Sequence, residues 1–260
     1  MKKIFALLII SAITFTSCSD DNDDNLKTKT EAKTSFNFTH NWDDTAIAGS
    51  DFENTQYTNA NGEMITMTRL RYIISDVTFT KANGESTTIE GYKLVDVTND
   101  DLNYNPEMKI PTGAYTSVSF TYGLKHEDNI DGAYTDLNSA SFNVPMAALG
   151  GGYHYMQFDG KYTNSTVTDA PFNYHHIRAV NAGMPPVFPD QPTFITVDLG
   201  AMTISDDITI EVKMNVAEWF KNPNTWDLNV LNQVLMPNAN AQLLMNQNGQ
   251  NVFGLGTVTQ

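Results

Sequence analysis

Ile208-Thr209-Ile210-Glu211-Val212-Lys213-Met214 alternates apolar and polar side chains without a break. Because successive side chains point to opposite faces of a strand, this stretch presents all four of its apolar residues to one side. The same period of two recurs in Tyr115–Gly123 and in Ile195–Leu199. A helix would need a period near 3.6 residues, so these stretches predict half-buried strands.

Turn signals separate the alternating stretches. They are Asn61-Gly62, Asn83-Gly84, Pro111-Thr112-Gly113, Asp131-Gly132 and Asp159-Gly160. Short strands divided by turns predict an all-β fold, either an antiparallel β-sandwich or a barrel-like domain. Helix is expected only near the C-terminus, as one turn at Ala217–Phe220 before Pro223 and a short helix at Asn240–Asn246. Asn238 is a suitable cap for that second helix and Gly249 a suitable stop.

The composition excludes several classes of protein. The chain has 260 residues, with 30 Asp and Glu against 15 Lys and Arg, so its formal net charge is −15. Nucleic-acid binding depends on pairing basic side chains with phosphates, and we therefore exclude nucleic acid as a partner. The single cysteine, Cys18, can form neither an intramolecular disulfide nor a cysteine-rich metal site. Hydrophobic residues make up 41% of the chain, which is enough for a core that rests on packing alone.

The N-terminus has the plan of a secretory signal. Lys2 and Lys3 precede an apolar run from residue 4 to residue 13, which is too short for a permanent membrane span. Phe15-Thr16-Ser17-Cys18 is typical of a bacterial lipoprotein cleavage box, and it contains the only cysteine of the chain. We predict a signal peptide over residues 1–17 and a lipid on Cys18 that anchors the protein to a membrane.

A polar, acidic segment follows the predicted lipid. Its composition cannot repay the entropy of ordering, so residues 18–34 are predicted to be a disordered tether and residues 35–260 a single β domain. The block Ser19–Asp24 resembles the export signal of surface lipoproteins in the Bacteroidetes, although a solvated linker explains it equally well. The expected location is the outer membrane, at the cell surface or facing the periplasm.

Signatures of enzymes are missing from the sequence. It has no Gly-x-Ser-x-Gly elbow, no phosphate-binding glycine loop and no His-Glu-x-x-His pair. A glycosidase pair of carboxylates could be present among the many acidic residues, but no spacing marks one. We therefore expect a protein that is not an enzyme.

Histidines suggest a metal site instead. If the strand that begins after Gly150-Gly151-Gly152 is regular, His154 and Met156 point the same way, and an imidazole beside a thioether suits copper. His175 and His176 point to opposite faces of a further strand, so at most one of them joins a given site. His40, on strand Phe36–His40, becomes a third nitrogen if its strand lies near the other two.

A second interpretation of the same histidines remains open. A histidine in a tyrosine-rich strand is often a hydrogen-bonded core residue, and Met156 can be ordinary packing. In that case the protein is a surface β-sandwich that binds a glycan or an envelope protein, with structural histidines. His126, within Lys125–Asn129, is expected to be a solvated loop residue outside any site.

The order of several segments resembles the copper-binding MbnP-like domain family over roughly residues 34–258. These segments are Asn61–Glu63, Leu70–Val77, Tyr92–Asp96, Ile110–Tyr115, Phe120–Leu124, Gly152–Gly160, Phe172–His175, Met236–Ala239 and Asn248–Phe253. The resemblance implies a secreted, β-rich protein that binds copper without catalysis. It carries over His154 and His175 as the matching histidines, with His40 as a weaker third.

The resemblance also implies a modified tryptophan. In methanotroph members, a kynurenine made from tryptophan joins the histidines on copper, and a partner di-haem MauG-like peroxidase makes it. Many relatives have a tryptophan after the position of Met146, where this chain has Ala147-Ala148-Leu149. Trp42, two residues after His40, is the tryptophan of this chain that lies near a candidate ligand.

Overall fold

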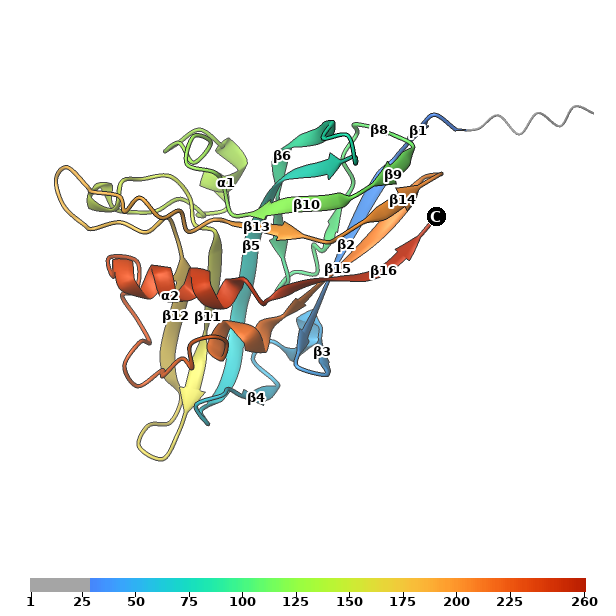
Figure 1. Cartoon of the computed structure of the whole chain (residues 1–260). Coiled ribbons are helices and arrows are strands. Elements are labelled where there is room, and N and C mark those ends of the chain that lie inside the picture. Colours follow the sequence, from blue (N-terminus) through green and yellow to red (C-terminus); the bar gives the residue numbers. More distant parts are fainter. Residues whose placement is uncertain (1–28) are drawn as a thin grey trace, which may run out of the picture.

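The computed structural model describes residues 29–260 and contains two facing sheets of unequal size (Figure 1). The larger sheet has the order β12-β11-β5-β10-β13, with β4 and β6 also paired to β5. Its strands are β4 (Gln56–Thr58), β5 (Met64–Thr80), β6 (Ser86–Asp96), β10 (Ser117–Tyr122), β11 (Met156–Thr163), β12 (Ala170–His176) and β13 (Ile195–Asp198).

The smaller sheet has the order β16-β15-β2-β3, with β7 also paired to β2. Its strands are β2 (Thr34–Trp42), β3 (Thr45–Ile47), β7 (Asn103–Tyr104), β15 (Ile208–Asn215) and β16 (Phe253–Thr259). Two short ribbons complete the sheets, β1 (Glu31–Ala32) with β8 (Ile110–Pro111), and β9 (Gly113–Tyr115) with β14 (Met202–Ile204). All pairings are antiparallel except that of β15 with β2, which is parallel.

Aromatic side chains fill the space between the two sheets. Phe38 of β2 meets Tyr72 of β5 and Phe120 of β10 edge to face, with ring centroids 6.1 and 6.3 Å apart. Phe253 of β16 packs on Phe120 at 5.4 Å. The apolar face of each predicted strand is therefore the inner face of a sandwich. The fold prediction is confirmed in its sandwich form, because the sheets of the described residues do not close into a barrel.

The alternating patterns predict strand faces correctly. In β2 the residues from Thr34 to Trp42 are alternately buried and half-buried, and β15 is alternately buried and more exposed. The centre of β5 differs, because Tyr72, Ile73 and Ile74 are all buried. Both faces of this central strand are covered, so its sequence has no simple alternation.

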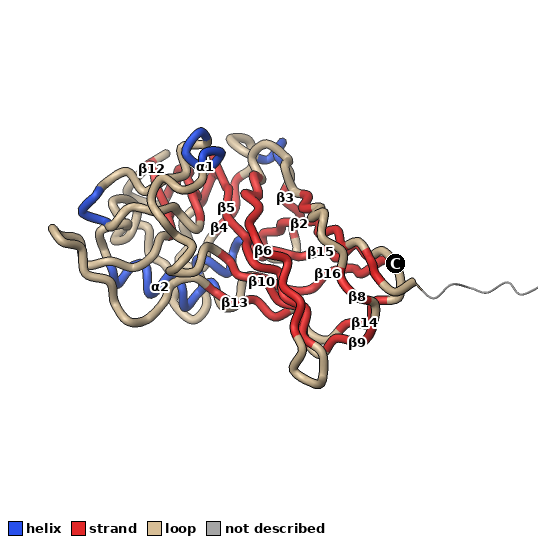
Figure 2. Tube along the Cα trace, turned by 90° about the horizontal axis from the view of Figure 1, so that it is seen from above, coloured by secondary structure: helices blue, strands red, loops and turns tan. Residues whose placement is uncertain are grey.

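Helices are short, and the two α-helices lie toward one end of the molecule (Figure 2). They are α1 (Thr135–Ser139), α2 (Ala239–Gly249) and the 3₁₀ turns η1 (Gly49–Asp51), η2 (Ala147–Leu149) and η3 (Val216–Phe220). The Asn238 side chain accepts a hydrogen bond from the backbone N–H of Ala241, which confirms the predicted cap of α2. Figure 2 shows that α1 and α2 lie at the end opposite to β8, β9, β14 and the C-terminus. Helix α1 was not predicted from the sequence.

Two boundaries differ from the predictions. The tether was expected to extend to residue 34, but β1 begins at Glu31 and the ordered domain therefore starts earlier. Asp159-Gly160 was expected to be a turn, but it lies within β11 at a shift of register. A Cβ on Gly160 would lie 2.5 Å from the carbonyl oxygen of Thr66, so glycine is needed here for close backbone approach. The predicted signal peptide and Cys18 lie outside the described residues.

Within residues 29–260, none of the helices has the length and apolar character needed to traverse a membrane.

Candidate metal-binding site

His154 and His175 lie in contact on the outer side of the larger sheet. Their ring centroids are 5.1 Å apart and the ring planes are nearly perpendicular, at 87°. His175 belongs to β12, and its register partner on β11 is Gln157, whose amide also lies 3.3 Å from Nδ1 of His154. The structure therefore brings together the two histidines that the sequence resemblance matched.

One nitrogen of His154 has no hydrogen-bond partner. Its Nδ1 lies 2.8 Å from the carbonyl oxygen of Phe142, and because a carbonyl can only accept, Nδ1 carries the proton. The other nitrogen, Nε2, is buried and without a partner among the described residues. Burial, together with the neighbouring charge of His175, lowers the pKa of His154 to about 3. The ring is therefore neutral at neutral pH, with a free lone pair on Nε2.

Asp159 holds the other histidine in place. The Nε2 of His175 donates to Oδ1 of Asp159 at 2.8 Å. The same carboxylate accepts from Nδ2 of Asn173 at 2.6 Å and from Nε of Arg69 at 2.6 Å. Burial acts to raise the pKa of Asp159, but the hydrogen bond and charge of His175, with Asn173 and Arg69, lower it to about 2. Both oxygens of this carboxylate are thus occupied by protein donors.

A second arginine completes the surroundings of the pair. Nε of Arg71 donates to Oε1 of Gln157 at 2.8 Å, and its guanidinium lies over the ring of Phe142, 5.4 Å from the centroid. Two guanidinium groups thus stand near two imidazoles and one carboxylate. Sequence reasoning did not identify Asp159, Arg69 or Arg71. The alternation of β11 was the available signal, since it places Asp159 on the same face as Gln157.

His40 does not join the pair, and its prediction as a third ligand is wrong. Its Nε2 lies 3.0 Å from the hydroxyl of Tyr72. Tyr72 and Arg71 are neighbours on β5 and therefore point to opposite faces of the sheet. Because Arg71 lies on the side of His175, His40 is in the core, on the other side of the larger sheet. Burial lowers the pKa of His40 to about 3.

Met156 is also on the core side, so the predicted pairing with His154 is wrong. Its register partners are Tyr72 and His176, and it is fully buried. The backbone of His154 bonds to Phe142, whereas that of Tyr155 already bonds to His176 of β12 and Ile73 of β5. The chain thus changes its pairing partner between His154 and Tyr155, and the alternation is not continuous across this junction. His176 faces the core as well, where its Nδ1 lies 3.1 Å from the hydroxyl of Tyr122.

Trp42 shares a face of β2 with His40, as predicted, and this face is turned to the core. Its ring stacks on Tyr57 and on Phe220, with centroids 5.1 and 5.7 Å apart. Its Nε1 donates to the carbonyl oxygen of Thr58 at 3.1 Å. Trp42 is thus packed and hydrogen-bonded on the side of the larger sheet away from His154 and His175.

The pair can offer a metal ion two imidazole nitrogens. In the part of the chain that the structure describes, no group of three or more His, Cys, Asp or Glu side chains is placed to hold a metal ion. Calcium and magnesium need six or more oxygen ligands, and structural zinc sites need four ligands, so the pair does not fit these ions. Two imidazole nitrogens with no free carboxylate fit a soft ion of low coordination number, such as Cu(I).

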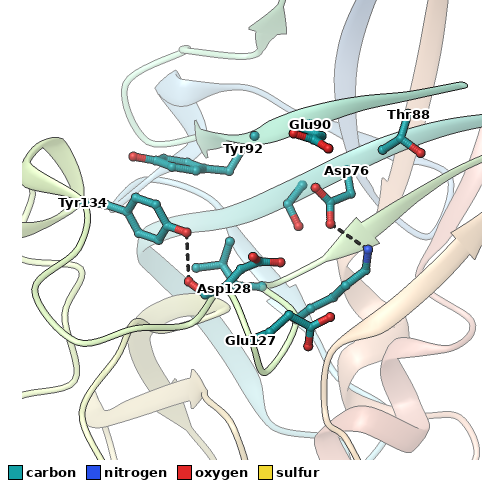
Figure 3. Close-up of a pocket in the computed structure, with 11 residues that line it drawn as sticks. Asp76, Thr88, Glu90, Tyr92, Glu127, Asp128 and Tyr134 are labelled. Carbon is teal, nitrogen blue, oxygen red and sulfur yellow. Dashed lines mark hydrogen bonds and ion pairs between the residues drawn. The ribbon is translucent and has the colours of Figure 1, made fainter.

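A separate acidic hollow lies on another part of the surface (Figure 3). Its cavity of about 540 Å³ is lined by Asp76, Glu90, Glu127 and Asp128, among others. Nζ of Lys125 pairs with Asp76 at 2.8 Å, and the Tyr134 hydroxyl donates to the backbone oxygen of Asp128. Partial burial, together with neighbouring carboxylates, raises the pKa of Asp128. This hollow includes none of the histidines.

Comparisons with known proteins agree with the fold. A family model described as MbnP matches residues 31–239. Among solved structures, MbnP from Methylosinus trichosporium is similar, with a TM-score of 0.51 and 12% sequence identity, over 76% of this chain and 80% of that one. At this identity the likeness concerns the fold alone. The curated proteins that were compared include no match.

Proposed function

The chain belongs to the MbnP family, and from this premise we propose that it captures or stores copper at the cell envelope without catalysing a reaction. His154 and His175 would hold the ion, and a lipid on Cys18 would anchor the protein to the outer membrane. The copper ion is cargo in this proposal.

One observation carries the assignment of the ligands. Histidines that bind metals almost always donate their second ring N–H to a carboxylate, a backbone carbonyl or water. His154 donates to the carbonyl of Phe142, and His175 donates to Asp159. The second nitrogen of each ring is thus left for a metal ion, and that of His154 is buried without a partner among the described residues. An unpartnered buried nitrogen is costly in a folded protein, and a bound metal ion would remove that cost.

The charges around the pair support a monovalent ion. Arg69 and Arg71 bring two positive charges, and Asp159 offsets one of them. Each further unit of charge on the metal increases its repulsion by the remaining guanidinium, so Cu(I) is favoured over a divalent ion. The charges of Arg69 and Arg71 also act to lower the pKa of His154, which favours the neutral ring that a metal ligand must have.

The proposal does not include a modified tryptophan or a di-haem partner. Trp42 is packed between Tyr57 and Phe220 on the core side, and β5 separates that side from His154. The ligand set proposed here uses histidine nitrogens only.

Copper titration tests the assignment. Metal-free protein would be titrated with Cu(I) under anaerobic conditions against a competing chelator. We expect one ion per chain, and binding weakened at least about a hundredfold when both His154 and His175 are changed to Ala. His126→Ala is the matched control, since His126 is exposed, and His40→Gln should also retain binding because it lies on the other face.

Thermal unfolding supplies an independent measurement. An ion that binds the native state must raise the melting temperature by mass action, and the double variant should lose this increase. Unchanged copper binding in the double variant would show that the ligands are wrong. If copper has no effect on melting of the wild-type protein, the proposed function itself fails.

A further inference from the structure

Arg178 is a half-buried cation without a carboxylate partner. The chain has three arginines. Arg69 forms an ion pair with Asp159, and Arg71 donates a hydrogen bond to the side chain of Gln157. No acidic side chain among residues 29–260 forms an ion pair with Arg178. Burial lowers the pKa of Arg178, and the neighbouring Tyr155 acts in the opposite direction. An unpaired buried charge is costly, and this one stands in a protein with a net charge of −15.

The guanidinium of Arg178 is held in a fixed plane. It lies over the ring of Phe188, only 3.5 Å from the centroid. Its Nη1 donates to the ring of His126, with 2.9 Å to Nδ1. The same Nη1 lies 3.2 Å from Nε2 of that ring, and within the described region Nε and Nη2 of Arg178 have no hydrogen-bond partner. A guanidinium that is stacked and fixed in this way is prepared for two parallel bonds to a carboxylate.

Gly150 makes room for this arrangement. Its φ is +83°, and a Cβ there would lie 2.2 Å from Cζ of Phe188 and 3.3 Å from Nη2 of Arg178. Any larger residue would displace the stacked pair. The glycine is thus required both by its backbone conformation and by the space that Phe188 and Arg178 occupy.

Arg178 and Phe188 line a cavity of about 560 Å³. Much of its wall comes from the long connection between β12 and β13. This connection lies at the end of the molecule that carries α1 and α2 (Figures 1 and 2). Proline and phenylalanine residues of that connection, Pro186, Pro189, Pro192 and Phe194, give the cavity apolar walls. A concave, largely apolar site with one directed polar group is typical of small-ligand binding. Asp190 also lines the cavity, but it does not pair with Arg178.

We infer that this cavity binds a carboxylate joined to a flat apolar group, with Arg178 holding the carboxylate and the proline and phenylalanine side chains holding the apolar part. Two sources offer this chemistry, a free aryl carboxylic acid and the C-terminal carboxylate of a peptide that ends in an aromatic residue. The inference is independent of copper binding, since neither His154 nor His175 lines the cavity.

Ligand-observed NMR titration of the whole protein tests the inference. Phenylacetate is the probe, phenylacetamide is its neutral counterpart, and N-acetyl-phenylalanine represents a peptide terminus. We expect both carboxylates to bind at least about tenfold more tightly than the amide, because charged hydrogen bonds contribute most of the difference. Tighter binding of N-acetyl-phenylalanine than of phenylacetate would assign the site to chain termini, and the reverse order to free acids.

Variants separate the role of Arg178 from general charge and from folding. Arg178→Gln and Arg178→Lys should each weaken carboxylate binding at least about tenfold, the second because lysine lacks the planar fork. Lys161→Gln removes the same charge at an exposed position of β11 and should leave binding unchanged. Asp190→Asn should strengthen binding, since it removes a like charge from the cavity. The inference is overturned if the amide binds as well as the acids, if neither acid binds into the millimolar range, or if Arg178→Gln binds like the wild type.

Discussion

His175 and Asp159 form a hydrogen bond of 2.8 Å between neighbouring strands, β12 and β11, on the outer face of the larger sheet. The bond fixes which nitrogen of His175 carries its proton. It also connects the histidine to Arg69 through the second oxygen of the carboxylate. Asp159 is therefore a positioning residue for the proposed copper site.

Asp159→Asn should weaken copper binding without removing a ligand. An amide at this position can still form a hydrogen bond with His175, but because it can donate as well as accept, it no longer fixes the tautomer of the ring. Loss of such a partner costs roughly 10–100-fold in metal affinity. The ratio of copper affinities, measured by chelator competition, checks this. Asp44→Asn, at an exposed position, is the control and should bind copper like the wild type. Equal affinities in all three proteins would contradict a positioning role for Asp159.

Stability should fall steeply as the pH is lowered from about 6.5. Burial lowers the pKa values of His40, His154 and His176 to about 3, whereas the unfolded chain takes up protons near the ordinary value of 6.5. Between these values the unfolded state binds more protons, so each histidine removes about 1.4 kcal/mol of stability per pH unit. The pKa of Asp159, lowered to about 2, adds to this loss only below about pH 4.

Urea unfolding of copper-free protein at several pH values measures that slope. His176→Gln should reduce the slope by about 1.4 kcal/mol per pH unit, because one titrating group is gone. Thr209→Ala, at an exposed position, is the control and should leave the slope unchanged, because it removes no titrating group. A slope that is the same in His176→Gln as in the wild type would show that His176 is not buried in a neutral state.

Two glycines with nearly equal backbone angles should respond differently to alanine. Gly84 has φ of +86° with open space around it, so Gly84→Ala costs about 1 kcal/mol of strain. Gly123 has φ of +88°, but a Cβ there would lie 2.6 Å from the ring of Tyr155, so Gly123→Ala should cost about 3 kcal/mol. Urea unfolding of both variants gives the difference, and equal losses would mean that Tyr155 does not pack against Gly123.

Cys18→Ser should release the protein from membranes. Cys18 is outside the described residues, and this expectation rests on the sequence pattern at the end of the predicted signal peptide. In the native host, wild-type protein should fractionate with outer membranes and incorporate labelled fatty acid, whereas the variant should do neither. Membrane association that survives in the variant would contradict a lipid anchor on this cysteine.

The sequence was sufficient to predict strands that have one buried face. β10, β13 and β15 lie where alternation predicted them, and the cap of α2 is the predicted Asn238. The sequence was insufficient for β5, because a strand covered on both faces loses its alternation. It also could not indicate the parallel pairing of β2 with β15, since pairing between distant strands depends on the arrangement of the whole chain.

The same limits explain which site residues were found. His154 and His175 were named correctly as neighbours, because the family resemblance supplied a spatial relationship that spacing alone does not contain. His40 was assigned to the wrong side, since sequence does not show which layer of a sandwich a strand occupies. Met156 was misplaced by the junction before β11, where one step of the alternation is lost. Arg69 and Asp159 lie 90 positions apart, so their ion pair had no local pattern.

The parallel pairing of β2 with β15 has a consequence for biogenesis. The two strands are linked side by side through Thr39 and Glu211, which are 172 positions apart. As the chain folds, β2 therefore keeps one edge unpaired until the residues of β15 are available. Late closure of so distant a contact slows folding and leaves an edge that can pair with other chains. A chaperone that shields this edge would accordingly raise the yield of folded protein.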